Sequence, residues 1–214
     1  AVCSMLAPWV LYVALTCLWS GARAIEFLPE IQNLFVSQEA VGSLNGVWPK
    51  STIKRSDTNS KPVMVLVTQP WCGACKNLKM SINAGTQFKS LMSSFNMVHV
   101  EGGNEWQEEG HGYVPQTYFY SRTGYPLTSI KGANSKYEHF FGEESQLAGA
   151  MRKALEVDQN AAEMQIKAKP LYEQHNPAKL SELPRLAVAY AMKKKDLLKD
   201  LARKYGEPQV KDEL

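Results

Sequence analysis

The chain has 214 residues, a hydrophobic fraction of 44%, a charged fraction of 21% and a formal net charge of +3. Its length suits one domain with appended segments, and its composition excludes wholesale disorder. The small net charge argues against nucleic acids and anionic membrane surfaces as binding partners.

The N-terminal segment has the pattern of a secretory leader. An apolar run from Pro8 to Trp19 precedes the small-residue sequence 21–24, so residues 1–24 are predicted to be a signal peptide. The run is shorter than the roughly 20 residues that a bilayer crossing needs, so no membrane association is expected after cleavage. The chain begins at Ala1 without a charged n-region, and an uncleaved buried helix is the alternative.

The C-terminal residues Lys211, Asp212, Glu213 and Leu214 form an ER-retrieval sequence, which a retrieval receptor recognises. Together with the leader, they predict location in the ER lumen, where disulfides form and exchange. Of the four cysteines, Cys3 and Cys17 lie in the leader. The mature chain therefore keeps Cys72 and Cys75, which excludes a framework of several disulfides.

The first half of the mature chain shows alternating helical and strand patterns. Apolar residues at helical spacing predict a helix over 31–41. A run rich in β-branched residues predicts a central strand over 62–68, buried on both faces. A helix is expected from Cys72 to about Met92 with an interruption at Gly85, followed by a second central strand over 95–100 and an acidic loop over 101–112.

Two further strands are predicted over 116–120 and 127–131, joined by a turn in which Gly124 takes the left-handed position. A helix over 143–158 completes this part. The order strand, helix, strand, hairpin, helix predicts an α/β domain over 25–158, with a central mixed sheet flanked by helices.

Residues 159–210 are predicted to form a helical C-terminal extension. A helix is expected over 161–169, and Pro170 and Pro177 indicate a linker. Ser181 is a candidate cap for a final helix that ends at Gly206.

The chemistry is predicted to reside in the sequence Trp71-Cys72-Gly73-Ala74-Cys75-Lys76, where a strand gives way to a helix. Unpaired N–H groups and a partial positive charge at a helix N-terminus favour the reactive thiolate of Cys72. Cys75, one turn further on, is expected to be shielded, and the spacing allows a disulfide between the two. Cys72 would attack a disulfide of a client protein, and Cys75 would resolve the resulting mixed disulfide.

The cysteine pair has two other interpretations, a zinc site and a structural disulfide. The pair could supply half of the ligands of a zinc site, but the mature chain has no second cysteine pair, and its histidines do not have zinc-finger spacing. A purely structural disulfide would close too small a loop to stabilise much. The redox dithiol is favoured, and neither a metal nor a bound cofactor is expected.

A second candidate site is formed by Val114 and Pro115, immediately before the predicted strand over 116–120. Pro115 is interpreted either as an edge residue or as a cis-proline packed against the dithiol. In the second case, the backbone of Val114 could pair with an extended client peptide.

The chain resembles the thioredoxin superfamily, and within it the small ER-resident relatives of protein disulfide isomerase, the family of thioredoxin domain-containing protein 12 and the anterior-gradient proteins. The resemblance covers residues 25–158 and implies a thioredoxin fold, with Cys72 as nucleophile, Cys75 as resolving thiol and Pro115 as cis-proline. It also implies client contacts for Trp71, Gly73, Ala74 and Val114. The segments that carry it are Pro62–Val65, Trp71–Lys76, Phe95–Val98, Gly112–Pro115 and Tyr137–Phe141.

Two departures from this family pattern concern the dithiol. Ala74 stands where disulfide isomerase domains have a histidine, which predicts a less oxidising pair. Leu66 stands where the family usually has a buried carboxylate, and Glu101 or a water molecule is a candidate substitute. His99 is interpreted as a packed histidine of a strand.

The function predicted first is thiol–disulfide exchange on cysteine-containing client proteins, with an ER oxidase or glutathione as a possible redox partner. The rival is a non-enzymatic chaperone or adaptor of the anterior-gradient type. A third interpretation is a binding module whose C-terminal helices dock a partner. Retention of both cysteines favours the enzyme, because a chaperone needs at most one.

Overall fold

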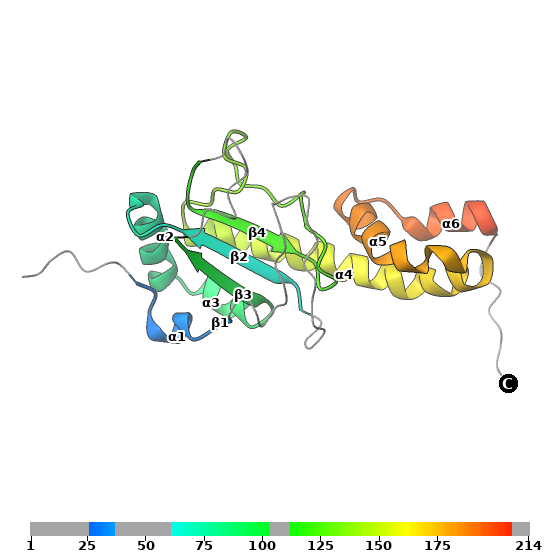
Figure 1. Ribbon diagram of the computed structural model, residues 1–214, viewed down its shortest axis with the longest axis horizontal. Coiled ribbons are helices and arrows are strands. Elements are labelled where there is room, and N and C mark those ends of the chain that lie inside the picture. Colours follow the sequence, from blue (N-terminus) through cyan, green and yellow to red (C-terminus); the bar gives the residue numbers. More distant parts are fainter. Residues whose placement is uncertain (1–25, 37–60, 103–111, 207–214) are drawn as a thin grey trace, which may run out of the picture.

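The computed structural model describes residues 26–36, 61–102 and 112–206. The predicted leader and retrieval sequence lie outside these ranges, as does most of the acidic loop. The elements, in chain order, are α1 (Pro29–Gln32), β1 (Phe35–Val36), β2 (Val63–Thr68), α2 (Gly73–Ala84), α3 (Gln87–Met92), β3 (Asn96–Glu101), β4 (Gln116–Tyr120), α4 (Glu144–His175), the 3₁₀ helix η2 (Pro177–Glu182), α5 (Leu183–Met192) and α6 (Leu197–Tyr205) (Figure 1).

The strands form one four-stranded mixed sheet in the order β1-β3-β2-β4. β3 runs parallel to both β1 and β2, and β4 runs antiparallel to β2. Every residue of β2 is buried, as predicted for a central strand. Because successive side chains of a strand alternate between faces, Val63, Val65 and Val67 pack on one face and Met64 and Leu66 on the other.

The face that carries Met64 and Leu66 belongs to the main hydrophobic core, to which α2, α3 and α4 contribute. Figure 1 shows α4 passing along the sheet and continuing beyond it toward α5 and α6. The opposite face carries a smaller cluster of valines with Tyr118 and Tyr120. The sheet is therefore buried on both faces around β2, which holds the residues that follow it in a fixed place.

The predicted helix over 31–41 is wrong for the residues that the structure describes. α1 ends at Gln32, and Phe35 and Val36 form β1, which pairs with Met97 and Val98 of β3. The ring of Phe35 lies 5.1 Å from that of Phe27. Pairing with β3 and this aromatic contact outweigh the local helical spacing. Residues 37–41 lie outside the described ranges.

The break between α2 and α3 falls at Gly85, as predicted. A side chain at Gly85 would meet the carboxylate of Glu144, the first residue of α4. That carboxylate accepts a hydrogen bond from the backbone N–H of Phe88. Glycine at this break therefore lets α4 begin directly against α3.

The predicted strand over 127–131 does not form. β4 is followed by the expected turn, with Gly124 at φ 86°, but only an isolated bridge joins Tyr120 to Pro126. Pro126 has no N–H to donate to a ladder. The chain then turns, with the N–H of Ile130 donating to the carbonyl of Leu127, and this turn buries both side chains in the main core.

The predicted end of the helix at 158 and the linker at Pro170 are also wrong, because α4 is continuous from Glu144 to His175. The boundary proposed between 158 and 159 thus falls inside one helix. Asp158 is buried and binds the turn after β4, accepting hydrogen bonds from the Arg122 backbone N–H at 2.7 Å and from its Nε at 2.8 Å. Pro170 is exposed, so water can satisfy the helical carbonyl that lacks its N–H.

The extension contains two helices rather than the single one predicted from Ser181. Ser181 lies inside η2, and α5 and α6 are separated by a turn in which Lys194 has φ 52°. Asp196 caps α6 by accepting hydrogen bonds from the N–H groups of Leu198 and Lys199 at 2.9 and 3.3 Å. α6 ends at Gly206, as predicted.

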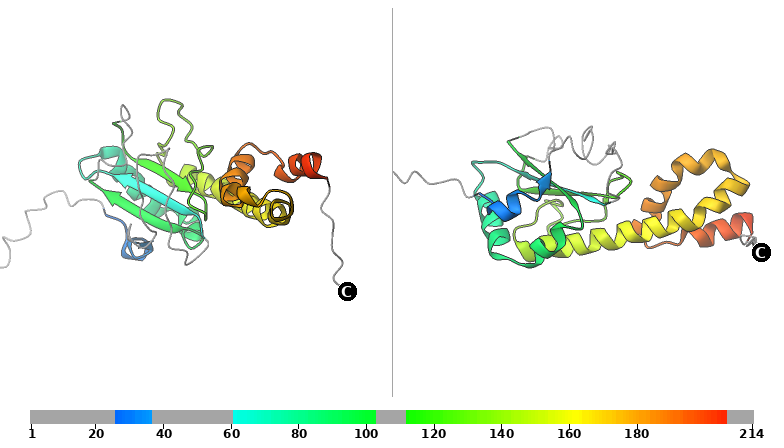
Figure 2. Two further views of the ribbon diagram at one scale, coloured as in Figure 1. Left: turned by 45° about the vertical axis from the view of Figure 1, so that its right-hand side comes forward. Right: turned by 90° about the horizontal axis from the view of Figure 1, so that it is seen from below.

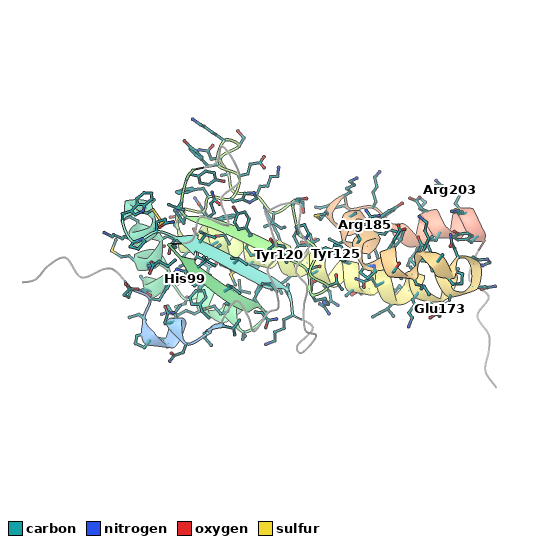
Figure 3. All side chains as sticks on the ribbon, in the orientation of Figure 1. His99, Tyr120, Tyr125, Glu173, Arg185 and Arg203 are labelled. Atoms are coloured by element: carbon teal, nitrogen blue, oxygen red, sulfur yellow. A yellow bond between two sulfur atoms is a disulfide. The ribbon has the colours of Figure 1, made fainter. Side chains whose placement is uncertain are left out.

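The extension forms a helical arm beside the sheet domain. In Figure 2, the second half of α4 carries α5 and α6 away from the sheet. The charged side chains of Glu173, Arg185 and Arg203 lie on the outside of this arm (Figure 3). Within the described ranges, none of the helices combines the length and apolar character that a bilayer crossing requires.

Candidate active site

The cysteine pair lies at the first turn of α2, immediately after β2. Cys72 is the N-cap residue and Gly73 the first residue of the helix. Cys72 and Cys75 form a disulfide, with their Cα atoms 5.3 Å apart. The Sγ of Cys72 also accepts a hydrogen bond from the backbone N–H of Cys75 at 3.0 Å. One otherwise unpaired N–H of the helix start is thus aimed at this sulfur, which stabilises negative charge there.

The two cysteines differ in their access to solvent. Cys72 is 5% exposed and Cys75 1%. The residues that border Cys72 are exposed, and Trp71 has 72% of its surface accessible. Cys72 therefore lies just below the surface beside an exposed aromatic ring, whereas Cys75 is enclosed, as expected for the shielded partner.

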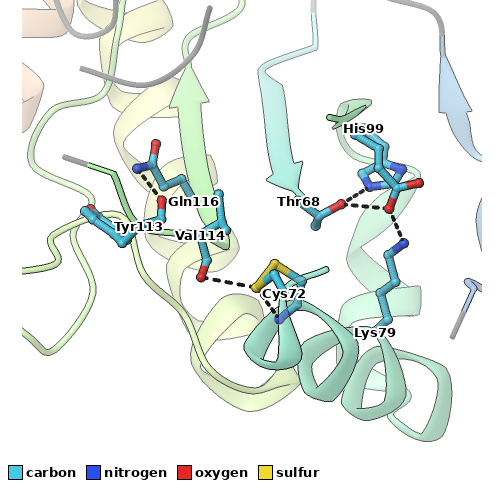
Figure 4. Close-up of a disulfide and its surroundings, with 9 residues drawn as sticks. Thr68, Cys72, Lys79, His99, Tyr113, Val114 and Gln116 are labelled. Atoms are coloured by element: carbon cyan, nitrogen blue, oxygen red, sulfur yellow. Dashed lines mark hydrogen bonds and ion pairs between the residues drawn. A yellow bond between two sulfur atoms is a disulfide. The ribbon is translucent and has the colours of Figure 1, made fainter. Parts of the chain in front are cut away.

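Val114 lies on the other side of the dithiol. The peptide bond between Val114 and Pro115 is cis, as predicted. The carbonyl oxygen of Val114 is 3.5 Å from the Sγ of Cys72 (Figure 4). In the dithiol form, the Cys72 thiol has a hydrogen to donate to this oxygen. The structure therefore brings the two predicted sites together at one sulfur atom.

A charged cluster lies on the side of the dithiol opposite Val114 (Figure 4). The Nζ of Lys79, one turn after Cys75 on α2, is 2.7 Å from Oε1 of Glu101 at the end of β3. The Oγ1 of Thr68 donates to the same carboxylate oxygen at 3.3 Å and lies 2.8 Å from Nε2 of His99. The ends of two parallel strands thus hold these groups next to the start of α2.

The cluster changes the protonation of its members. Burial and then the nearby Lys79 cation lower the pKa of His99 to about 4, against the opposing effect of Glu101. For Glu101, burial acts to raise the pKa, but the hydrogen bond and charge of Lys79 outweigh it and leave the pKa below its usual range. At neutral pH, the cluster therefore contains a neutral imidazole and a carboxylate paired with a lysine cation.

No protein-family model matches the chain. Among solved structures, it is similar to a thioredoxin-fold protein from Helicobacter pylori, at 12% identity and a TM-score of 0.29, over 77% of this chain and 99% of that chain. The strand order is β1-β3-β2-β4, β4 is antiparallel, and the cysteine pair lies between β2 and α2. The chain has the thioredoxin fold.

Within this thioredoxin fold, the predicted residues Cys72, Cys75, Val114 and Pro115 lie together, whereas the partners of Glu101, Lys79 and Thr68, were not predicted. Leu66 is buried and apolar, as its sequence position implied. His99 is a packed histidine, with its ring 5.2 Å from that of Phe27. The one sequence signal for Lys79 was its spacing from Cys75, which places both on the same side of α2. Among the described residues, no three His, Cys, Asp or Glu side chains are grouped as a metal site.

Proposed function

We propose that this protein is a thiol–disulfide oxidoreductase that acts on cysteine-containing client proteins. The observation that carries the proposal is the Cys72–Cys75 disulfide at the N-terminus of α2, with the more accessible sulfur beside the Val114 carbonyl. A thiolate at a helix N-terminus is a good attacking and leaving group in disulfide exchange.

In the reducing direction, the Cys72 thiolate attacks one sulfur of a client disulfide. A mixed disulfide forms between Cys72 and the client, and the second client sulfur leaves as a thiolate. Cys75 loses its proton and attacks the Sγ of Cys72, which breaks the mixed disulfide and releases the first client sulfur. The client has gained two electrons and the protein ends in the disulfide form. Oxidation of a client dithiol follows the same steps in reverse.

The extended client segment is proposed to lie across Val114, with Trp71, Gly73, Ala74 and Pro115 contacting it. The exposed ring of Trp71 offers apolar surface next to the reacting sulfur. An exposed aromatic side chain also suits the rival function, a chaperone or adaptor that binds clients without exchanging their disulfides. Catalysis of exchange separates the two.

The decisive assay is the reduction of insulin disulfides by dithiothreitol, with and without the protein. We expect the wild-type protein to accelerate it and Cys72→Ser to abolish the acceleration, because the remaining thiol of Cys75 is enclosed and cannot reach a client disulfide. Cys75→Ser should instead accumulate mixed disulfides, visible on non-reducing gels. The two variants control for each other, since both lose the same disulfide. Failure of the wild-type protein to accelerate exchange would favour the chaperone.

Location in the ER lumen is part of the proposal. Its support is the leader-like pattern of residues 1–24 together with Lys211–Leu214, which would be bound by the retrieval receptor. In the ER lumen, the redox partner of this protein would be an ER oxidase or glutathione. Membership of the anterior-gradient family, which the sequence resemblance suggests, is part of the same proposal. Appending residues after Leu214 should release the protein into the medium of expressing cells, and unchanged retention would contradict retrieval.

Ala74 bears on the direction of exchange. Without a histidine between the cysteines, the Cys72 thiolate lacks one stabilising charge, so the pair should be less oxidising than disulfide isomerase domains. Equilibration with glutathione buffers measures this, and a potential like those of the strongest oxidants would contradict it. An isomerase role would require, in addition, that the protein refold scrambled ribonuclease.

A further inference from the structure

A small cavity lies beneath the dithiol and joins Cys75 to the charged cluster. Its volume is about 20 Å³, and its lining includes Cys75, Lys79, Glu101 and Glu26. A cavity needs about 10–15 Å³ to hold one water molecule, which must also find polar partners. This cavity meets both conditions. It is a polar connection between the resolving sulfur and a carboxylate.

The resolving step creates a need for such a connection. Cys75 must lose its proton before its sulfur can attack Cys72, because the thiolate is the nucleophile. It is 1% exposed, so bulk water has little access to that proton. Leu66, fully buried on β2, has no group that accepts a proton. Among the residues that line the cavity with Cys75, the carboxylates of Glu101 and Glu26 are the groups able to accept that proton.

Glu101 has the properties of that acceptor. Lys79 and Thr68 hold its Oε1 at 2.7 and 3.3 Å, which keeps the carboxylate ionised and oriented. The side chain of Glu101 is 35% exposed, so a proton taken from the cavity can pass on to solvent. His99 contacts Thr68 rather than the cavity lining. Glu26 also lines the cavity, 3.7 Å from Lys79, but its side chain is 60% exposed.

We propose that Glu101, held in place by Lys79, accepts the proton of the Cys75 thiol through this cavity during the resolving step. The inference rests on the proposed function. As the Cys75 sulfur forms its bond to Cys72, the bond between Cys72 and the client sulfur breaks, and the client leaves as a thiolate. The proton travels from Cys75 to Glu101 and then to solvent. No other oxidant is needed, since the client disulfide supplies the oxidising equivalents.

The two chemical steps can be timed separately with dithiobis(nitrobenzoate). Attack by Cys72 of the reduced protein releases one coloured thiolate, and resolution by Cys75 releases the second. General-base catalysis contributes about 10²- to 10⁴-fold, so we expect Glu101→Gln to slow the second release at least about tenfold at pH 7. The first release should keep its rate. The second release of the variant should then rise steeply with pH, because only pre-ionised Cys75 reacts.

Glu26→Gln is the matched control, because it removes the other carboxylate of the same cavity and should leave both releases unchanged. Glu101→Asp retains an acceptor at a longer reach and should slow the second release by less than Glu101→Gln. If Glu101→Gln fails to fold, the rate of the second release in Glu101→Asp tests the proposal instead. A normal second release in whichever of the two variants folds, or equal slowing by Glu26→Gln, would overturn the inference.

Failure of the proposed function would look different. In that case the wild-type protein would not accelerate the reduction of insulin by dithiothreitol, even though its free thiols still react with dithiobis(nitrobenzoate). A normal first release in every Glu101 variant, with no change in the second, would instead leave the redox function intact and remove only the role of Glu101.

Discussion

Two residues of α2 and β3, Lys79 and Glu101, bring opposite charges close to a dithiol whose neighbouring strand is apolar. Lys79 is only 5% exposed in its side chain, and a buried lysine without a counter-ion would be costly. Its pairing with Glu101 at 2.7 Å offsets that cost. His99 lies beside this pair and stays neutral, because burial and then the nearby positive charge of Lys79 lower its pKa.

This neutral state of His99 predicts a dependence of stability on pH. Its pKa is about 4 in the folded protein against an ordinary value of 6.5, so the unfolded chain binds more protons between these values. Stability is therefore fully present above pH 6.5 and falls as the pH drops toward 4, by roughly 3 kcal/mol. Urea unfolding of the disulfide form at several pH values measures the loss.

His99→Gln should remove this part of the pH dependence. His175→Gln should keep it, because His175 is exposed on the arm and stacks on Tyr205. Because the charges of His99 and Glu101 influence each other, the difference between the variants reports His99 together with its effect on Glu101. Identical pH profiles for the two variants would show that His99 does not carry the effect.

Among the elements, α4 links the sheet domain to the arm. Its first half packs on α3, and Asp158 binds the turn after β4 through Arg122. Its second half packs on α5 and α6. The helix remains continuous through Pro170 because the buried side chains Ala168, Leu171 and Tyr172 on either side are held by the arm. Tertiary packing thus sustains a helix that its own sequence disfavours.

Replacing this proline should stabilise the protein. Pro170→Ala restores a backbone N–H inside α4 and removes a ring that crowds the preceding turn, so we expect a gain of about 1–3 kcal/mol in the free energy of unfolding. Lys167→Ala, at an exposed position of the same helix, should change it by less than about 0.5 kcal/mol. Urea denaturation measures both. A loss of stability in Pro170→Ala would mean that the proline makes contacts that the helix requires.

At the scale of the whole molecule, the hydrophobic core extends from the sheet into the arm without interruption. The same cluster contains Leu66 of β2, Met151 of α4 and Leu201 of α6. The dithiol lies at the start of α2, and the described hydrogen bonds of Cys72 join it to α2, Gln69 and Val114, with none to α5 or α6. The arm can therefore contribute to stability without taking part in thiol chemistry.

Truncating a buried side chain of α6 should separate these roles. Leu201 is 5% exposed, so Leu201→Ala should cost about 2–4 kcal/mol of stability. Replacing the half-buried Leu198 by alanine should cause a smaller loss of stability. In both variants, the rate of the first thiolate release from dithiobis(nitrobenzoate) should match the wild type under conditions where the protein is folded. A parallel fall in that rate would mean that the arm acts on the dithiol.

The features predicted correctly from sequence depend on local properties of the chain. The buried strand β2 follows from its continuous run of β-branched and apolar residues, and the first turn of α2 from the sequence around Cys72. Gly85, Gly124 and Gly206 end elements or form turns because short segments there need a break or a positive φ. The cysteine pair was recognisable because Cys72 and Cys75 are close in sequence and lie at the boundary between a strand and a helix.

The remaining features were decided by contacts between distant segments. Phe35 and Val36 form a strand only because β3 lies beside them, and the strand expected after Gly124 is lost to burial of Leu127 and Ile130. The pairing of Lys79 with Glu101 joins a helix to a strand end 22 residues away. Such pairings leave no periodic pattern in the chain, since they exist only where packing brings separate elements together. The sulfur chemistry could be recognised in the sequence, but its electrostatic surroundings arise only in the folded protein.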